Sequence, residues 1–521
     1  MLRIITTNLK PISVSLLCLI SIATFAQSVD TQESQPPAPA SSSSPFDFLR
    51  KLPNPFSNRD VPRLKTLDEG VYAKSPEAIG DARDIENIRL AALGLVDIPT
   101  MSAELNRVYA SLKVASGIKE IPGKVYITAD SSLDGQSTAD GNIFLSIGWI
   151  RTLESEDELA ALLAHELGHI LLRHHDTNLW GKLQKQIQTL FAVSSTVQYK
   201  LENLNTKEIK LPAKDVATIQ RMQLLIMLND RVLHPGWKRG QESDADQISA
   251  DLLVKSGYSL NSGTKAFLEH VIDWEERQSK IQEERKNKTT KMVNDLMAEK
   301  KMDAAITLSL KNGVKDLFDQ LATSHDSAET RLADVVEYGK KFYADYAGKP
   351  KAGDFVRIRN NREVKSILDS YNDTFVAINN IEEEKLGDAI KTLERITNLK
   401  SPVASHVLPN FWRYMALKQS GNEKDALAAL KKTADLRDPY WPVVEALASR
   451  ENALGKRDSA GQIVERGIEK FERTPGVYPK AVLLYRQLGL NDQASKLAGT
   501  CGLQFPEHRD ACARNNRPIG P

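Results

Sequence analysis

The chain has 521 residues, enough for roughly two to four domains that each bury a core of their own. Its 69 lysine and arginine residues balance 68 aspartate and glutamate residues, so the net charge is close to zero. A chain without a basic excess is not expected to bind nucleic acid or an anionic membrane surface. The composition therefore argues against a polyelectrolyte partner, and we predict that the chain binds no nucleic acid.

The N-terminus has the pattern of a secretory signal peptide. Arg3 and Lys10 precede an apolar run at 12–25, and the small residue Ala26 follows it. We predict that residues 1–26 are a signal peptide that is cut after Ala26. An uncleaved membrane anchor is the alternative, although the apolar run is short for a bilayer span. No later run in the sequence is apolar for long enough to cross a bilayer, so the mature chain is predicted to have no transmembrane segment.

A change in composition separates the N-terminal segment from a globular part. Residues 27–65 are rich in serine and proline and are predicted to form a disordered tether. Residues 66–350 are predicted to form one domain, with a helix expected at 102–116. The runs at 124–128 and 142–147 have the β-branched and aromatic residues of strands. This domain is therefore expected to combine several helices with a small sheet.

A helix that carries two histidines is predicted to follow the second strand. Ser155 and Glu158 form a capping box at its start. At about 3.6 residues per turn, His165 and His169 project from one face, one turn apart, so both imidazoles can bind one ion. Glu166 lies beside them and can deprotonate a water molecule on that ion. This H-E-x-x-H pattern predicts a catalytic zinc site with a general base.

A third protein ligand is expected from a second helix. Glu242 begins a predicted helix that ends near Gly257, and Asp246 lies one turn further along the same face. The carboxylate of Asp246 can hold a ligand histidine in position. We therefore predict one Zn2+ per chain, bound by His165, His169 and Glu242, with a fourth position open to water.

Two further histidines, His174 and His175, close the predicted zinc helix. We interpret them as favourable groups at the C-terminal end of the helix dipole rather than as metal ligands. The alternative for the whole H-E-x-x-H pattern is a helix whose histidines have only structural partners. The acidic residues of the second helix favour the zinc site over that alternative.

The C-terminal part of the sequence predicts pairs of helices with an internal repeat. Gly421, Gly455 and Gly489 recur at the period of about 34 residues that is typical of tetratricopeptide repeats. An alanine follows each of these glycines at the same offset. Residues 366–500 are therefore predicted to form an all-α tetratricopeptide-like solenoid. The concave surface of such an array holds a peptide or a protein.

One unit of the predicted array departs from the pattern. Gly387 lies one such period before Gly421, but its nearest helix-opening alanine, Ala389, is out of phase by three positions. We therefore expect an irregular unit there. Chance spacing of the glycines is the alternative for the array as a whole, although the matching alanines argue against it.

Two cysteines remain in the mature chain, Cys501 and Cys512, both in a predicted C-terminal tail at 501–521. An even pair of cysteines in an exported chain favours a disulfide. Two unpaired thiols are the alternative. We predict the disulfide because the signal peptide directs the chain to an oxidising compartment.

These motifs together resemble a known group of zinc peptidases. The run that ends in H-E-x-x-H, the E-x-x-A-D sequence at 242–246 and the sequence SHDSAETR at 324–331 are similar to those of the zinc metallopeptidases related to HtpX and to the CAAX prenyl protease. The resemblance implies an α+β zincin-like (gluzincin) metallopeptidase domain, mostly helical with a small sheet. With its signal peptide and repeats, the chain is most similar to the β-barrel assembly-enhancing proteases of the Gram-negative periplasm.

The resemblance also implies roles for residues beyond the predicted ligands. His325 would face the zinc, either stabilising the oxyanion or capping the metal in a latent state, and Arg331 would position that segment or the substrate. The strand at 142–147 would bind the substrate backbone by strand addition. The chain departs from the group at Asp326, where relatives carry proline, and in a longer spacer at 178–240.

The function implied by the resemblance is zinc-dependent hydrolysis of peptide bonds in the cell envelope, with misfolded or stalled outer-membrane or periplasmic proteins as substrates. The repeats would bind these polypeptides or the outer-membrane β-barrel assembly machinery. The chain would be periplasmic, either free or peripheral to the outer membrane. The alternative is a chaperone or scaffold that acts mainly by binding and whose zinc site is latent.

Overall fold

A computed structural model describes residues 60–67, 70–90, 94–176, 239–298, 327–346, 348–351, 353–438 and 440–517. The predicted signal peptide, most of the predicted tether and His325 lie outside these residues. The chain forms two compact units, Met1–Asn54 and Pro55–Pro521. Every described residue lies in the second unit. Within the described ranges, no helix is both long and apolar enough to span a membrane.

A small sheet of three strands has the order β1-β3-β2. β3 (Ile143–Ser146) pairs in parallel with β1 (Val125–Thr128) and antiparallel with β2 (Gly135–Ser137). The predicted strands at 124–128 and 142–147 correspond to β1 and β3. The sequence does not predict β2, because Gly-Gln-Ser has neither β-branched nor aromatic side chains. The expectation that the second predicted strand offers an edge to a substrate is wrong, since β1 and β2 pair with both edges of β3.

The helix that carries H-E-x-x-H, α5 (Glu156–Leu171), is buried along its whole length. The hydroxyl of Ser155 accepts a hydrogen bond from the backbone N–H of Glu158, at 3.1 Å. The Glu158 carboxylate accepts one from the backbone N–H of Glu154, at 2.7 Å. The N-cap at Ser155 that the sequence predicts is therefore present and satisfies one N–H of the first turn, whereas the return bond of Glu158 goes to Glu154, one residue before the N-cap position of a full capping box.

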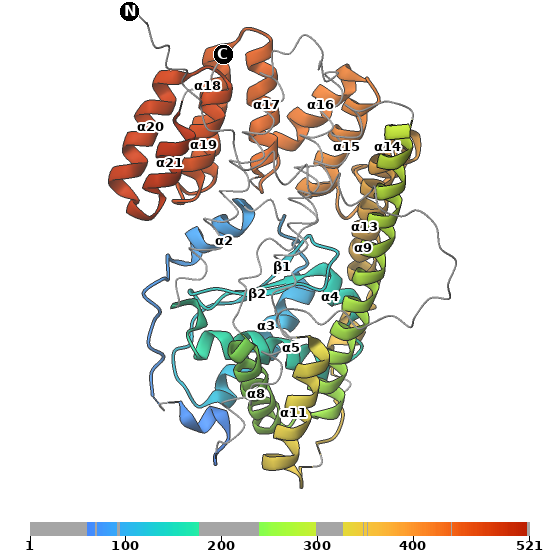
Figure 1. The fold of residues 1–521 in the computed structure, drawn as a ribbon, viewed down its shortest axis with the longest axis vertical. Helices are drawn as coiled ribbons and strands as arrows, with labels where there is room; N and C mark the ends of the chain where they lie inside the picture. The colour runs from blue at the N-terminus through green and yellow to red at the C-terminus, as the bar shows by residue number, and fades with distance from the viewer. Residues whose placement is uncertain are drawn as a thin grey trace, which may run out of the picture. The chain divides into compact units, whose positions relative to one another are not determined.

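Helical elements surround α5 and the sheet (Figure 1). In chain order they are η2 (Arg63–Thr66), α2 (Asp81–Leu90), α3 (Pro99–Ser116), α4 (Ile147–Thr152), η3 (His174–Asp176), α8 (Arg239–Ser256), the π-helical turn η4 (Asn261–Lys265), α9 (Ala266–Ala298) and α11 (Ala328–Tyr343). α3 contains the helix expected at 102–116 and contacts both α5 and β1. Figure 1 shows α8 and α11 on the side of α5 away from the sheet.

The C-terminal half of the chain is entirely helical where the structure describes it. After the short helix α12 (Phe355–Arg359), consecutive helices pack as pairs: α13 (Arg362–Glu382) with α14 (Leu386–Ile396), α15 (Val407–Gln419) with α16 (Glu423–Ala434), α17 (Trp441–Ala453) with α18 (Arg457–Lys470), and α19 (Val477–Gln487) with α20 (Asn491–Gln504). A turn η5 (Pro506–His508) and a last helix α21 (Arg509–Asn515) follow. These pairs agree with the predicted succession of helices, whereas the tetratricopeptide assignment stays a prediction.

The repeated glycines lie in the turns inside three of these pairs. Gly421, Gly455 and Gly489 have φ angles of 80°, 76° and 73°, a left-handed conformation that glycine adopts without steric cost. The alanine that follows each glycine at the common offset is buried in the next helix; these alanines are Ala426, Ala460 and Ala494. The period seen in the sequence therefore corresponds to one turn and one close helix contact per pair.

The irregular unit expected at Gly387 has a simple explanation. Gly387 lies within α14, and the left-handed residue in the turn before α14 is Glu384, with a φ of 62°. The buried Ala389 follows Glu384 at the same offset as the alanines of the other pairs follow their glycines. The unit keeps the local geometry of the other pairs, and the turn is displaced by three positions from the glycine spacing.

The helix α2 contacts both the sheet and the helical pairs. The buried carboxylate of Asp84 accepts hydrogen bonds from the side chains of Thr138 and Asn142, at 2.6 and 2.8 Å, in the turn between β2 and β3. At the other end of α2, Leu90 is buried in a cluster with Trp441 and other residues of α17 to α20. α2 therefore connects the β2–β3 turn directly to the core of the last helical pairs.

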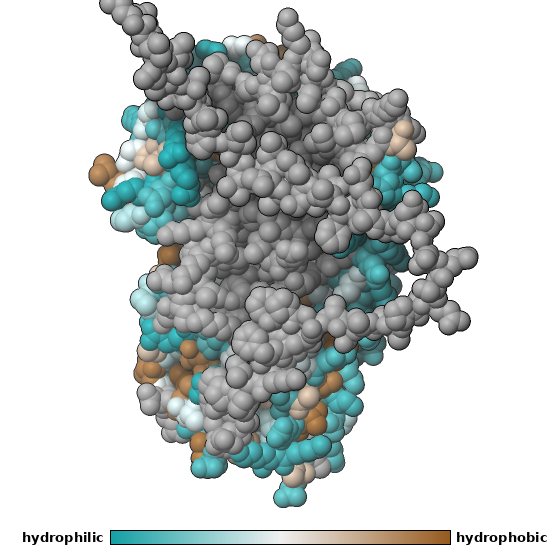
Figure 2. All heavy atoms as spheres, viewed as in Figure 1, coloured by the Kyte–Doolittle hydropathy of each residue, from teal (hydrophilic) through white to brown (hydrophobic). Residues whose placement is uncertain are grey.

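Where the described residues are visible in Figure 2, most of their surface is hydrophilic. Apolar side chains on that face occur in small groups. The most exposed large apolar residues, Val114, Leu399 and Leu503, lie on α3, after α14 and on α20. Single exposed apolar side chains of this kind are usual on protein surfaces and need no special function.

The C-terminal end of the helical pairs is closed by a disulfide. Cys501 of α20 and Cys512 of α21 are bonded and completely buried. α21 also packs against α19, so the bond ties the last helix to the last pair. The predicted disulfide is therefore present in the structure.

We expect this disulfide to stabilise the C-terminal helices by about 3 kcal/mol, because it closes a short loop and limits the unfolded chain. Replacing both Cys501 and Cys512 by serine should lower the free energy of local opening of α19 to α21 by that amount, measured by amide hydrogen exchange. A reductant should weaken protection in the wild-type chain and have no effect on the double variant. Equal protection in the oxidised wild type and the variant would contradict the expectation.

Candidate metal centre

His165 and His169 lie one turn apart on α5 and point the same ring nitrogen at one place. Their Nε2 atoms are 3.1 Å apart. Both side chains are buried, with exposed fractions of 5% and 1%. The helical periodicity brings the two imidazoles to one face of α5, and the surrounding core holds them there.

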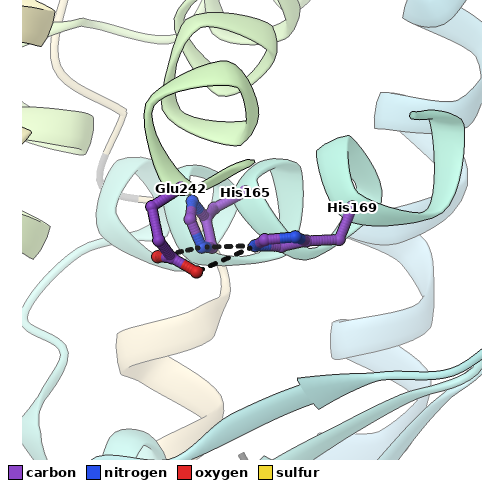
Figure 3. A group of neighbouring side chains, drawn as sticks. All are labelled: His165, His169 and Glu242. Carbon is purple, nitrogen blue, oxygen red and sulfur yellow. Dashed lines mark hydrogen bonds and ion pairs between the residues drawn. The ribbon is translucent and has the colours of Figure 1, made fainter. Parts of the chain in front are cut away.

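Glu242 reaches the same place from the first turn of α8 (Figure 3). Its Oε2 lies 3.6 Å from Nε2 of His165, and its Oε1 lies 3.5 Å from Nε2 of His169. The three ligand atoms are within 4.8 Å of one another. The structure therefore brings together the three residues that the sequence analysis selects as ligands.

The spacing of these atoms suits a small tetrahedral ion. Ligand atoms about 2.0–2.1 Å from a zinc ion at tetrahedral angles lie roughly 3.3 Å from one another. The two Nε2 atoms are 3.1 Å apart, and each lies 3.6 or 3.5 Å from a different oxygen of the Glu242 carboxylate, which is close to that value. Two neutral imidazoles and a carboxylate are also a ligand set that zinc commonly has in proteins. The residues present therefore fit a zinc ion.

A glycine allows α5 and α8 to cross closely enough for this geometry. A Cβ atom at Gly168 would lie only 3.0 Å from both the Cα and the carbonyl oxygen of Ala245. Real Cβ atoms are rarely that close to backbone, so any side chain at this position would push the helices apart. Gly168 lies just before His169, and Ala245 just before Asp246, so the crossing point is the centre of the site.

Asp246 and Arg331 form a buried network behind the ligands. The Asp246 Oδ1 lies 2.8 Å from Nδ1 of His165, on the opposite side of the ring from Glu242. Arg331 of α11 donates two hydrogen bonds to the two oxygens of Asp246, both at 2.8 Å. Its third nitrogen lies 3.0 Å from Oε2 of Glu242. Arg331 therefore holds both acidic residues of α8 in place.

A second set of contacts fixes α8 further along its length. The buried carboxylate of Asp251 accepts hydrogen bonds from the hydroxyls of Tyr338 and Tyr343 on α11, at 2.8 and 2.7 Å. It also accepts one from the backbone N–H of Leu64 in η2, at 2.7 Å. α8 is therefore fastened to α11 and to η2 as well as to α5.

Burial and neighbouring charges shift the pKa values of Asp246 and of both histidines. Burial raises the pKa of Asp246, but Arg331 and His165 outweigh it and lower that pKa to about 2. Burial lowers the pKa of His165, and the Asp246 carboxylate outweighs burial, so the net direction is upward from 6.5. Burial and the nearby His165 lower the pKa of His169 well below its usual value. His169 is therefore neutral at physiological pH, whereas His165 retains affinity for a proton.

His174 lies closer to the site than its sequence position suggests. Its side chain is buried, and its Nδ1 lies 2.8 Å from Nδ1 of His169. Burial lowers the pKa of His174 to about 3. The interpretation of His174 as only a favourable group at the helix dipole is therefore wrong, because its neutral ring contacts a ligand candidate. A histidine about one and a half helical turns after the H-E-x-x-H motif is the sequence feature that could have predicted this contact.

Glu166 follows the ligand candidate His165 on α5 and lies close to the sheet. It is buried, and one carboxylate oxygen is 3.1 Å from the point where a Cβ of Gly135 would lie. Gly135 begins β2, so the absence of a side chain there lets the strand approach the carboxylate. Sequence reasoning missed Gly135 because the short strand β2 was not predicted. Of the predicted site residues, His325 lies outside the described part of the chain.

A buried helix with H-E-x-x-H, opposed by a glutamate from a second helix beside a small sheet, is the arrangement of a metallopeptidase. Residues 99–338, a little under half of the chain, match the model of Peptidase family M48. The resemblance to this group of peptidases that the sequence motifs indicate is thereby confirmed.

A curated relative from Vibrio cholerae serotype O1 is described as a β-barrel assembly-enhancing protease. This chain is 20% identical to it over 173 residues, which are 33% of each protein. The chain therefore spans about a third of the length of the relative that it matches.

We expect Gly168→Ala to lower the unfolding free energy by about 1–3 kcal/mol, because the new methyl group meets the backbone of α8. The affinity for Zn2+ should fall as well, measured by competition with a chelator. The matched control is Gly499→Ala in α20, where a Cβ meets nothing within 4 Å and where alanine should stabilise the helix. A rise in melting temperature for both variants would contradict the close crossing.

The affinity for Zn2+ should also depend on pH through His165. A proton and a metal ion compete for its Nε2, so affinity should fall about tenfold per pH unit once the pH is below the His165 pKa. Because that pKa is raised from 6.5, the fall should begin above this value. Asp246→Asn removes the group that raises the pKa and should move the onset to lower pH. The same affinity at pH 8 and pH 5.5 would refute the assignment.

Proposed function

We propose that the chain is a zinc-dependent endopeptidase. The observation that carries this proposal is the convergence of His165, His169 and Glu242 on one point beside Glu166, within the residues that match Peptidase family M48. The carboxylates of Glu242 and Asp246 are both buried at or behind the two histidines, and a divalent cation would offset negative charge there.

The proposed ligands would hold zinc through two Nε2 atoms and the Glu242 carboxylate, with a fourth position for water. Bound zinc would lower the pKa of that water and polarise the scissile carbonyl group. Glu166 would accept a proton from the water at a carboxylate oxygen and transfer it to the leaving amine. Asp246 and Arg331 would keep the ligands in position.

The substrate is proposed to bind along β2. Segment 94–96 covers the outer edge of β1, with hydrogen bonds between Val96 and Ile127 and between Ala129 and Gly94, at 2.8 and 2.7 Å. In the described part of the chain, the outer edge of β2 has no partner strand. An extended peptide added there would run past Gly135 and so past the Glu166 carboxylate.

The place and clients of the enzyme are part of the proposal. The predicted signal peptide at 1–26 and the buried disulfide support export to the periplasm. The proposed clients are misfolded or stalled outer-membrane or periplasmic proteins, and the name of the Vibrio relative, which refers to β-barrel assembly, supports an outer-membrane client. The helical pairs would bind these polypeptides or the β-barrel assembly machinery, free in the periplasm or at the outer membrane. His325 is proposed to act at the zinc, as an oxyanion donor or as a cap.

The helical pairs favour a second candidate function. Their regular turns and buried alanines are suited to a solenoid that binds protein, so the chain could serve mainly as a chaperone or scaffold with a latent site. The two candidates differ in whether the carboxylate of Glu166 is needed.

Glu166→Gln should abolish hydrolysis of an unfolded protein such as casein, lowering the rate at least about 10²-fold, because an amide cannot accept the proton. The variant should still bind one zinc per chain, since its ligands are unchanged. Metal analysis measures the zinc content, and a peptidase assay on the same sample measures the rate of hydrolysis. The matched control is Glu394→Gln on α14, a half-exposed residue that should keep full activity.

His169→Ala should lose both zinc and hydrolysis. Full zinc content in this variant would refute the ligand set. Cellular function that survives Glu166→Gln would instead favour the scaffold over the peptidase.

A further inference from the structure

The two ligand histidines have different partners on their Nδ1 atoms. Nδ1 of His165 faces the carboxylate of Asp246, at 2.8 Å. Nδ1 of His169 faces another imidazole, that of His174, also at 2.8 Å. A histidine that binds metal through one nitrogen almost always donates a hydrogen bond from the other, and the acceptor orients the ring.

We propose that His174 is the positioning residue of His169: its Nδ1 accepts the Nδ1–H of His169 and holds Nε2 on the metal. This inference rests on the proposed zinc site. It assigns to His174 neither a bond to the metal nor a contact with substrate. Its role is to set the tautomer and the orientation of one ligand.

The direction of this hydrogen bond follows from the chemistry of the ring. If Nε2 of His169 gives its lone pair to an ion, the proton of the neutral ring must be on Nδ1. Two nitrogens 2.8 Å apart share one proton, so Nδ1 of His174 presents its lone pair. His174 therefore carries its own proton on Nε2. A side chain without an acceptor at this position would leave the buried Nδ1–H of His169 without this bond.

The backbone after α5 is shaped to bring His174 to this position. α5 ends at Leu171, and Arg173 has a φ of 52°, a left-handed conformation that is uncommon for residues other than glycine. The chain reverses there, and η3 begins at His174. The ring of His174 then packs on that of His169 at a centroid distance of 5.0 Å. A strained residue next to the site is consistent with a turn retained for its geometry.

Three substitutions separate the acceptor from the bulk of the side chain. His174→Asn places an amide oxygen where Nδ1 lies in histidine and should keep the hydrogen bond. His174→Gln places its polar group further from the backbone, and His174→Leu has no acceptor. We expect zinc affinity near that of wild type for asparagine and a fall of about 10–100-fold for glutamine and leucine.

The measurement is the dissociation constant for Zn2+ by competition with a chelator, on the full-length chain, with circular dichroism to establish folding. His406→Leu is the control for loss of a partly buried histidine, since His406 pairs with Tyr371 outside the site. It should bind zinc as wild type does. If the leucine variant is unfolded, the comparison of asparagine with glutamine carries the test.

A spectroscopic readout distinguishes positioning from general stability. In the Co2+-substituted protein, each ligand Nδ1–H should give an exchangeable, shifted proton signal in the NMR spectrum. The signal of His169 should be lost to exchange with water in His174→Leu and retained in His174→Asn. The signal of His165 should persist in both, because Asp246 is its partner.

The outcomes separate this inference from the function on which it rests. A wild-type chain that binds no zinc would overturn both. A wild-type chain that binds one zinc, together with unchanged affinity and unchanged His169 signal in His174→Leu, would overturn the role of His174 alone. Equal losses in the asparagine and leucine variants would also overturn it, because bulk and not the acceptor would then be decisive.

Discussion

The close crossing of α5 and α8 at Gly168 and Ala245 is the constraint on which the candidate centre depends. Two histidines on one helix approach an ion from one side only, so the third ligand must come from an opposing element. Since Gly168 has no side chain, α8 lies near enough for Glu242 to meet both Nε2 atoms. The same crossing sets Asp246 against His165. One packing contact thus places a ligand and the support of another ligand.

This geometry places several charged side chains close together in the protein interior. Glu242, Asp246 and Arg331 are all buried, and an isolated charge in such surroundings would be strongly unfavourable. The guanidinium contacts both carboxylates, so neither charge is left unpaired. α11 supplies Arg331 and, through Tyr338, a second fastening of α8. The helix α11, which carries Arg331, is therefore part of the support of the candidate metal centre.

The connection between the centre and the helical pairs runs through the sheet and α2. β2 lies beside Glu166, the β2–β3 turn is hydrogen-bonded to Asp84, and Leu90 at the other end of α2 is buried with α17 to α20. The first helical pairs also share a continuous apolar core with the peptidase part. A substrate strand on β2 and a polypeptide on the helical pairs would thus contact elements joined by one short helix.

Local periodicity determined much of this protein from the sequence alone. The N-cap at Ser155, the common face of His165 and His169, and the turns that recur at a constant interval depend on neighbours close by along the chain. The family motifs added Glu242 and the peptidase class. Tertiary structure alone decided the pairing of both edges of β3, the approach of β2 to Glu166 and the contact of His174 with His169. These features depend on packing between segments, or on one left-handed residue, and neither leaves a periodic signal in the amino-acid sequence.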